Sequence, residues 1–270
     1  MITGETIVYG VIGNPVAHSL SPVMHNQAFS NTGYPGVYLP FQVQDIGAAV
    51  DGIRALNVRG VSVTIPHKEA VMPYLDQIDD SAREIGAVNT VVNDKGRLIG
   101  YNTDAYGAVT ALSEKTDIKN KDVVILGAGG AARAISYGVL KQGGRLHVLN
   151  RSAEKGERLA GFLGAVFYPM DRFDQAPCDI LINTTPVGMH PEVDAMPVAR
   201  NRLNDHMVVM DIIYNPVKTR LLEAAEAIGA QVISGVPMFV YQGARQFELW
   251  TGLDAPVDLM KEVVYEALNE

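Results

Sequence analysis

Short apolar segments alternate with stretches of helical period along the chain, and this alternation predicts an α/β fold. The first hundred residues contain segments expected to form strands, at 7–12, 61–65, 88–93 and 97–101. Two helices are expected here, one beginning at Ser21-Pro22 with the serine as N-cap, and one at 45–56. Asp94-Lys95-Gly96, between the last two strands, predicts a hairpin turn.

A helix expected at 104–113 and a polar stretch at 114–121 precede a second α/β unit, which has its own first strand. Its expected elements are strands at 122–126, 145–149, 180–183 and 207–213, a helix that ends near 142, and a helix at 153–163. Two further helices, near 239–250 and 257–268, close the chain. Because they have no strand partner, they could pack on either unit.

A glycine-rich turn follows the first strand of the second unit. Gly127, Gly129 and Ala132 have the spacing of the dinucleotide-binding fingerprint, between a strand and a helix. Gly127 allows the tight turn, and Gly129 lets the backbone approach a pyrophosphate at the helix N-terminus. No Lys-Ser or Lys-Thr pair follows, which excludes a Walker-type phosphate loop. A turn without a ligand is the alternative, but the flanking strand and helix favour a cofactor.

The residues after the next strand indicate which cofactor binds. An NAD site usually has an acidic residue there, about 20 residues after the glycines, which binds the ribose 2′-hydroxyl. This chain has Asn150, followed by Arg151, Ser152 and Lys155. Two cations and a hydroxyl suit the 2′-phosphate of NADP, and the helix dipole disfavours a cation such as Lys155 unless an anion binds nearby. A solvated, charged helix start is the alternative.

Composition narrows the range of partners. The 270 residues are 47% hydrophobic and 19% charged, as in a globular protein, and carry a net charge of −8. This charge disfavours non-specific binding to nucleic acid or to an anionic membrane. Cys178 is the only cysteine, so a reducing, cytoplasmic compartment is expected. We expect no signal peptide, no membrane span and no metal site.

Four polar positions of the first unit have both a structural and a functional interpretation. Ser21 is plausible as an N-cap alone, and Lys68, considered by itself, as an ordinary surface lysine. Asn89 interrupts an apolar strand, where its amide needs hydrogen-bond partners. Asp104 lies where the two units meet, a preferred place for a ligand cleft, although it could simply cap the next helix.

Together these motifs resemble the shikimate dehydrogenase family along nearly the whole chain. The matching segments are 13–22, 63–68, 86–90 and 100–104 in the first half, and 127–131, 150–152, 183–189, 211–216 and 235–243 in the second. The resemblance implies an N-terminal α/β substrate domain, residues 1–104 joined by the C-terminal helices of 239–270. It further implies a Rossmann-type NADP-binding domain at 105–238.

The activity implied by this resemblance is the reversible reduction of 3-dehydroshikimate to shikimate with NADPH, in the biosynthesis of aromatic amino acids. Lys68 and Asp104 are the expected catalytic pair. The expected substrate ligands are Ser19, Ser21, Thr64, Asn89, Tyr214 and Gln242. The expected cofactor contacts are Gly127, Ala128, Gly129, Gly130, Ala131, Asn150, Arg151, Ser152, Lys155, Ile212, Gly235 and Met238. A monomer or a homodimer is expected.

Three alternative functions remain beside this one. A quinate/shikimate dehydrogenase of the same family is the nearest, but both Ser19 and Ser21 are present, which favours shikimate over the bulkier quinate. A non-catalytic NADP-binding regulator is the second, and retention of Lys68 and Asp104 argues against it. An interaction module that uses the acidic surface is the third, and the complete cofactor motif disfavours it.

Overall fold

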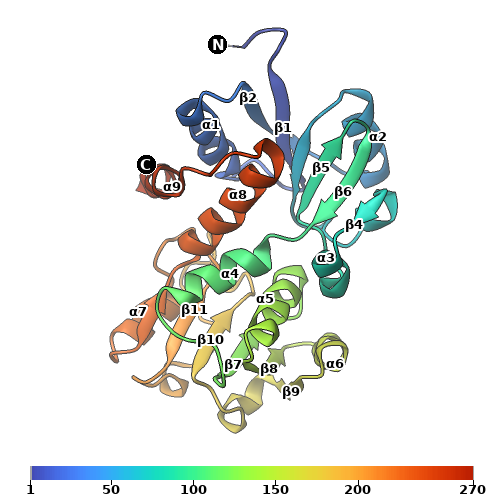
Figure 1. Ribbon diagram of the computed structural model, residues 1–270. Coiled ribbons are helices and arrows are strands. Elements are labelled where there is room, and N and C mark those ends of the chain that lie inside the picture. Colours follow the sequence, from blue (N-terminus) through green and yellow to red (C-terminus); the bar gives the residue numbers. More distant parts are fainter. Residues whose placement is uncertain (1, 270) are drawn as a thin grey trace. The chain divides into compact units, whose positions relative to one another are not determined.

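The computed structural model describes residues 2–269, which fall into two compact units. The first unit is Met1–Thr103 together with Gln242–Glu270, and the second is Asp104–Tyr241. The units therefore divide after residue 103 rather than 104, and the chain returns to the first unit at residue 242 rather than 239. Both units combine helices with a largely parallel sheet, which confirms the expected α/β class (Figure 1).

Among the described residues, the first unit contains a six-stranded sheet in the order β2-β1-β3-β5-β6-β4. Its strands are β1 (Ile7–Gly13), β2 (Gly36–Gln42), β3 (Gly60–Val63), β4 (Gln77–Ile78), β5 (Thr90–Asp94) and β6 (Arg97–Tyr101). β1 is parallel to β2 and β3, and β5 is antiparallel to both β3 and β6. The carboxyl ends of β1, β3 and β6 therefore lie at the same edge as the start of β5.

Helices cover both faces of this sheet. They are α1 (Ser21–Thr32), α2 (Ile46–Ala55), the 3₁₀ turn η1 (Met72–Tyr74), α3 (Asp80–Ile85), α9 (Val257–Asn269) and the last part of α8 (Gly235–Thr251). One face packs α2 and α3 against aliphatic strand residues such as Val61 and Val91. The other face carries an aromatic cluster in which Tyr9 contacts Phe29 and Trp250, with ring centroids 5.1 and 5.4 Å apart.

Three local predictions for the first unit need correction. The N-cap of α1 is Leu20, so Ser21 is the first helical residue and its side chain makes no capping bond. The third strand ends at Val63 rather than at Ile65, and Ile65 is 72% exposed. β2 was not predicted, because Pro40 interrupts its pattern; an edge strand tolerates proline, since one side of its ladder is unpaired.

The hairpin prediction is confirmed. β5 and β6 pair from Asp94 opposite Arg97, and the two residues between them have positive φ angles of 52° at Lys95 and 92° at Gly96. Positive φ at both central positions matches the right-handed twist of the flanking strands, and glycine adopts it without a steric penalty.

The second unit contains a six-stranded sheet, counted over its described residues, in the order β12-β11-β10-β7-β8-β9. Its strands are β7 (Asp122–Leu126), β8 (Arg145–Asn150), β9 (Val166–Pro169), β10 (Ile180–Asn183), β11 (Val208–Asp211) and β12 (Gln231–Ile233). All neighbouring pairs are parallel. Read from β9, the strands follow the order 3-2-1-4-5-6 of a dinucleotide-binding fold, and the direction of winding switches between β7 and β10.

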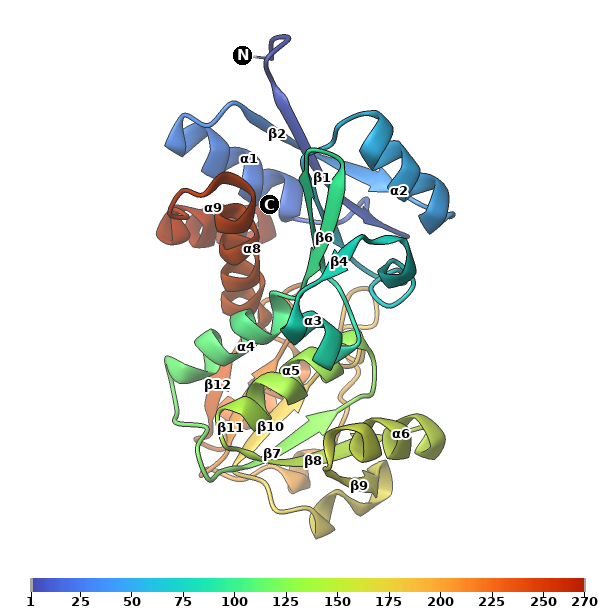
Figure 2. The ribbon, with the colours of Figure 1, turned by 45° about the vertical axis from the view of Figure 1, so that its right-hand side comes forward.

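Both faces of the second sheet are buried, which is why its central strands read as continuous apolar runs. The helical elements of this unit are α4 (Asp104–Ser113), α5 (Gly130–Lys141), α6 (Ala153–Leu163), η2 (Met170–Gln175), η3 (Arg200–Arg202), α7 (Arg220–Glu226) and the first part of α8. Val123 and Ile125 pack with α4 and α5, which lie on one side of the sheet (Figure 2). Val124 and Leu126 pack on the other side, with residues of η2 and α7.

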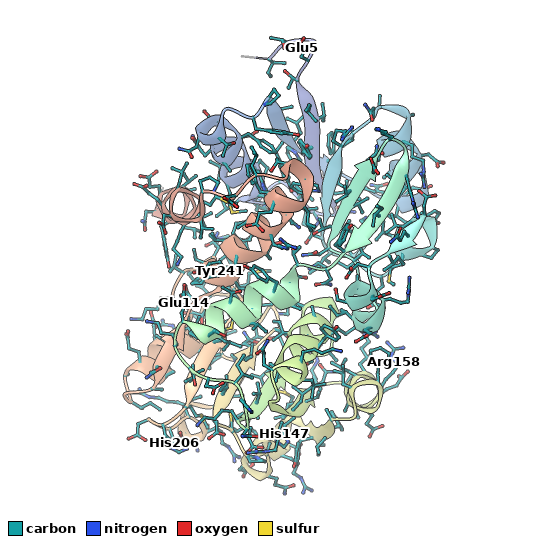
Figure 3. All side chains as sticks on the ribbon, in the orientation of Figure 1. Glu5, Glu114, His147, Arg158, His206 and Tyr241 are labelled. Atoms are coloured by element: carbon teal, nitrogen blue, oxygen red, sulfur yellow. The ribbon has the colours of Figure 1, made fainter. Side chains whose placement is uncertain are left out.

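The part of α8 that belongs to the second unit is tied to the segment after α4. The Tyr241 hydroxyl donates a hydrogen bond to the Glu114 carboxylate, and Figure 3 shows these two side chains meeting. Gln242, the next residue of α8, is the first residue of the returning segment. The end of α4 and the middle of α8 are therefore fixed to each other within this unit.

Candidate active site

Polar residues far apart in sequence gather at one edge of the first sheet. The Thr64 amide donates to the Ile12 carbonyl at 2.9 Å, and the Asn14 amide donates to the Ile65 carbonyl at 2.9 Å, which joins the loops after β1 and β3. The Val63 amide donates to the Asn89 carbonyl at 2.7 Å. The loops that carry Ser19, Thr64 and Asn89 therefore meet at the end of this sheet.

Hydrogen bonds of the Lys68 backbone and of the adjacent His67 side chain fix Lys68 at this edge of the sheet. Its carbonyl accepts a hydrogen bond from the Val88 amide at 2.8 Å, which fixes Lys68 beside the approach to Asn89. The buried His67 ring has Nε2 2.8 Å from the Val43 carbonyl, where it must donate. Lys68 itself is only partly exposed. The backbone of Lys68 therefore lies at the same sheet edge as Asn89, and its side chain is not fully exposed.

The two serines after β1 lie next to each other. The Ser21 amide donates to the Ser19 hydroxyl at 3.3 Å, and Ser21 is 6% exposed at the start of α1. Because Ser21 is not the N-cap of α1, helix capping does not account for its hydroxyl. The Ser21 hydroxyl is instead near Tyr38. Burial raises the pKa of Tyr38, and hydrogen bonding by Ser21 opposes this rise.

Asn89 has the hydrogen-bond partners that its place in an apolar segment requires. Its Oδ1 accepts from the Thr90 hydroxyl at 2.7 Å and from the Thr103 amide at 2.8 Å. Its Nδ2 donates to Thr103 Oγ1 at 3.0 Å and to Gln242 Oε1 at 3.4 Å. The structure thus brings together Asn89 and Gln242, two expected substrate ligands that are 153 positions apart.

Asp104 is the first residue of α4 and of the second unit, directly after Thr103. A carboxylate in the first turn of a helix interacts favourably with the helix dipole. This interaction is the structural alternative to a catalytic role. Asp104 does not precede the helix as an N-cap would, since it already lies within α4.

The glycine turn lies at the switch point of the second sheet. Gly127 has φ of 116°, and a Cβ atom there would lie 2.5 Å from Thr184 Oγ1, so only glycine fits. The Thr184 hydroxyl donates to the Leu126 carbonyl at 2.6 Å, which joins the ends of β7 and β10. Gly129 is the N-cap of α5, and a Cβ atom there would meet nothing within 4 Å. Ala128 precedes it, and Gly130 and Ala131 begin the helix.

The turn after β8 presents polar groups in an exposed position. Asn150 Nδ2 donates to the Ser152 carbonyl at 2.8 Å, which closes the turn. Ser152 is the N-cap of α6 and accepts from the Lys155 amide at 3.4 Å. Its hydroxyl proton stays available to an acceptor such as a phosphate. Arg151, Ser152 and Lys155 are all exposed, and Glu154 shares the helical turn.

The last expected cofactor residues lie beside the end of β11. The Ile212 amide donates to the Asn183 carbonyl at 3.1 Å, and the Gly235 amide donates to the Ile213 carbonyl at 3.1 Å. A Cβ atom at Gly235 would lie 2.3 Å from the Ile212 carbonyl oxygen, so glycine lets α8 start against this segment. The Tyr214 ring packs against Phe239 in a tilted arrangement, with centroids 4.7 Å apart, and Met238 is buried.

Sequence reasoning missed a buried carboxylate at this edge. Asp211 is fully buried and accepts hydrogen bonds from Asn183 Nδ2 at 3.0 Å, the Ile213 amide at 3.1 Å and the Thr219 hydroxyl at 2.7 Å. Burial raises the pKa of Asp211 to about 6, although these three donors oppose the rise. Asp211 therefore fixes the segment that leads to Tyr214. The sequence signal that could have identified Asp211 is its position at the end of an apolar strand.

Asp211→Asn is expected to change how stability depends on pH. A raised pKa means that the folded state binds the proton more tightly, so the stabilisation is complete below about pH 3.8 and is lost as the pH rises through about 6. Relative to the unsubstituted chain, the variant should gain up to about 3 kcal/mol of unfolding free energy between pH 4 and 7. Urea unfolding of both proteins across this range measures the difference. A difference that is constant with pH would contradict the prediction.

No helix within residues 2–269 has the length and apolar character needed to cross a membrane. In the same part of the chain, no group of three or more His, Cys, Asp or Glu side chains is arranged to hold a metal ion.

Family models match nearly the whole chain. The shikimate dehydrogenase substrate binding domain matches residues 11–91, the shikimate/quinate 5-dehydrogenase model matches 110–223, and the shikimate 5′-dehydrogenase C-terminal domain matches 235–265.

Similar proteins cover the chain from end to end. The NADP(+) shikimate dehydrogenase of Geobacillus kaustophilus is 49% identical over 272 residues, which is 97% of this chain and 99% of that protein. A shikimate dehydrogenase solved with NADP+ is 42% identical over 100% of this chain and 98% of its own, with a TM-score of 0.97. The Thermus thermophilus enzyme, solved with NADP(H) and shikimate, is 36% identical over 97% and 100%, with a TM-score of 0.91. The chain therefore belongs to the shikimate dehydrogenase family.

Proposed function

We propose that this chain is an NADP-dependent shikimate dehydrogenase, which reduces 3-dehydroshikimate reversibly to shikimate. The observation that carries this proposal is the edge of the first sheet, where Thr64, Lys68 and Asn89 are tied together by backbone hydrogen bonds. Residues with hydroxyl, amide and amine side chains lie at this edge, in a chain that belongs to a family of oxidoreductases acting on a CH–OH group. The first unit is accordingly the substrate domain, and the second unit is the NADP domain.

The polar edge suits a carboxylate that carries several ring hydroxyls. The residues that we assign to the substrate all carry hydrogen-bonding side chains; they are Ser19, Ser21, Thr64, Asn89, Gln242 and Tyr214. A site built to bind hydroxyls rejects analogues that lack them, because its own buried groups would then be unpaired. Ser19 and Ser21 together favour shikimate over quinate, which carries an additional hydroxyl on the ring carbon that bears the carboxylate.

Reduction of the ketone needs one group to supply a proton and stabilise the developing negative charge on oxygen. NADPH, when bound, supplies the hydride. Lys68 is the group we assign to the oxygen, since its ammonium can both donate the proton and stabilise the oxyanion. Asp104 orients the Lys68 amine and binds a ring hydroxyl of the substrate. In the reverse direction the Lys68 amine accepts the proton from the substrate hydroxyl.

Several residues within the second unit fit a bound dinucleotide. Gly129 leaves open space where a Cβ atom would stand, directly at the N-terminus of α5, so a pyrophosphate can approach the backbone amides there. Gly127 packs against Thr184, whose hydrogen bond to Leu126 joins the ends of β7 and β10 at the switch point of the sheet. Arg151, Ser152 and Lys155 are the residues that would hold the 2′-phosphate.

Gly129→Ala is expected to weaken NADPH binding without weakening the fold. The added methyl group meets no protein atom within 4 Å, and the backbone at Gly129 (φ −91°) is open to alanine. The methyl group would instead occupy space assigned to the pyrophosphate, and a rise of about tenfold or more in the KM for NADPH is expected. Steady-state kinetics and thermal unfolding measure both properties. A large fall in Tm, or an unchanged KM, would contradict this use of the open space.

An absorbance assay at the NADPH band tests the proposed function. NADPH oxidation with 3-dehydroshikimate, and NADP reduction with shikimate, should both be observed with the purified chain. Quinate should be a much poorer substrate. No turnover in either direction would support the alternative of an NADP-binding regulator, and equal turnover of quinate and shikimate would support a dual-specificity dehydrogenase.

We also propose a cellular compartment and an oligomeric state for the chain. The single, partly buried Cys178, whose pKa is raised to about 12 by burial, suits a reducing compartment, and we assign the chain to the cytoplasm. A monomer or a homodimer is the expected state, which light scattering after size-exclusion chromatography measures directly.

A further inference from the structure

A series of buried side chains lies behind Asn89 in the first unit. The Tyr38 hydroxyl donates to Ser62 Oγ at 2.6 Å, and Ser62 Oγ donates to Gln246 Oε1 at 2.7 Å. Gln246 Nε2 then donates to Thr90 Oγ1 at 2.9 Å, and the Thr90 hydroxyl donates to Asn89 Oδ1 at 2.7 Å. All five side chains are buried, so water does not compete for these bonds.

The direction of this series is fixed by backbone groups that can only accept or only donate. Gln246 Nε2 lies 3.2 Å from the Asn89 carbonyl oxygen, which can only accept, so the Gln246 amide must turn its NH₂ group this way. The Thr103 backbone N–H, 2.8 Å from Asn89 Oδ1, can only donate. Burial raises the pKa of Tyr38, which keeps its hydroxyl protonated as the first donor.

The consequence is a single orientation of the Asn89 side chain. With Oδ1 occupied by Thr90 and by the Thr103 amide, a flip of the Asn89 amide would lose two hydrogen bonds. Its NH₂ group is therefore turned toward Thr103 Oγ1 and Gln242 Oε1. Gln242 and Gln246 are four residues apart on α8, so they lie on the same face of that helix.

We infer that Gln246 is a positioning residue for substrate binding, which acts through Thr90 by stabilising the orientation of the Asn89 amide. This inference rests on the proposed function, because it concerns the substrate contacts of Asn89. Gln246 supplies no group to the substrate. Together with the Thr103 amide, it holds Asn89 with Oδ1 turned toward Thr90 and keeps Nδ2 beside Gln242, the other expected substrate ligand.

Gln246→Met tests the inference, since it keeps the size of the side chain and removes its hydrogen bonds. The KM for shikimate should rise about tenfold, with a smaller change in kcat and none in the KM for NADP. Trp250→Phe is the matched control. It removes the hydrogen bond from Trp250 Nε1 to the Val91 carbonyl, one turn further along α8, and should lower Tm while leaving the KM for shikimate unchanged.

A double-mutant cycle with Asn89→Ala separates positioning from a general loss of structure. If Gln246 acts through Asn89, Gln246→Met should leave the KM for shikimate unchanged when alanine already stands at position 89. Persistence of the full tenfold rise in that background would overturn the inference, as would an equal rise in Trp250→Phe. Should Gln246→Met fail to fold, Thr90→Val removes the hydroxyl between Gln246 and Asn89, and the same rise and the same cycle are expected.

The cycle also distinguishes this inference from the proposed function. An unchanged KM for shikimate in Asn89→Ala would reject both the substrate contact of Asn89 and the positioning role of Gln246. Turnover of shikimate by the unsubstituted chain, measured in the same assay, would still support the dehydrogenase activity. Absence of that turnover would instead reject the proposed function itself.

Discussion

Lys68→Ala is expected to lower kcat by at least about 10²-fold, with little change in the KM for shikimate. This range is typical of the loss of a general acid or base. The effect should fall on kcat because the ammonium interacts most strongly with the oxygen once negative charge has developed there. Steady-state kinetics in the direction of shikimate oxidation, with NADPH binding measured by fluorescence, check both parts of the prediction.

The fold should tolerate this substitution. The hydrogen bond that holds this position in the sheet edge uses the Lys68 carbonyl and the Val88 amide, and alanine retains it. Lys115→Ala, an exposed lysine after α4, serves as the control and should leave kcat and KM unchanged. Asp104→Ala should differ from Lys68→Ala by damaging kcat and KM together, since Asp104 is assigned both to Lys68 and to the substrate.

Each possible outcome has a distinct meaning. A near-normal kcat in Lys68→Ala would remove Lys68 from the mechanism. Loss of the fluorescence change that reports NADPH binding, in either variant, would show that the fold had been damaged, because neither residue belongs to the glycine turn. An Asp104→Ala variant with normal KM and kcat would remove Asp104 from the mechanism and favour a structural role at the start of α4.

Four of the six strands described in each sheet were predicted, and the four that were missed, β2, β4, β9 and β12, are edge strands. Strands buried on both faces, such as β7 and β10, are continuous apolar runs, and the helices between them have a clear period. β9, by contrast, lies at an edge and is only partly buried, so its sequence carries little signal. β4 has only two residues. These short edge strands depend on pairing with a neighbour, which a local pattern does not contain.

The site shows the same division between local and non-local information. Gly127 could be recognised because its turn is determined by neighbouring residues, and its φ of 116° agrees with that role. Gln246 could not, because a glutamine on an amphipathic helix normally indicates a solvated face. Its burial follows from partners on β3 and at the start of β5, 184 and 156 positions away. Ser21 was read locally as an N-cap, and the helix begins one residue earlier than that reading requires.

Arg151→Ala is expected to remove most of the preference for NADP over NAD. Arg151 is exposed in the turn after β8, and the position before it is Asn150 rather than an acidic residue that would bind a free ribose 2′-hydroxyl. A charge-assisted hydrogen bond contributes about 1.5–3 kcal/mol, which corresponds to a rise of about 10- to 150-fold in the KM for NADP. The KM for NAD should stay nearly unchanged, because NAD lacks the 2′-phosphate that Arg151 would bind.

Arg158→Ala provides the matched control for this prediction. Arg158 is an exposed arginine on α6, labelled in Figure 3, and it lies beyond the first turn that carries Lys155. Its removal changes the net charge equally and should leave the ratio of kcat/KM for the two cofactors unaltered. Because the Arg151 contact is exposed, its contribution should also weaken as ionic strength rises. Equal kcat/KM for NADP and NAD in the unsubstituted chain, or equal effects of the two arginine substitutions, would refute the role assigned to Arg151.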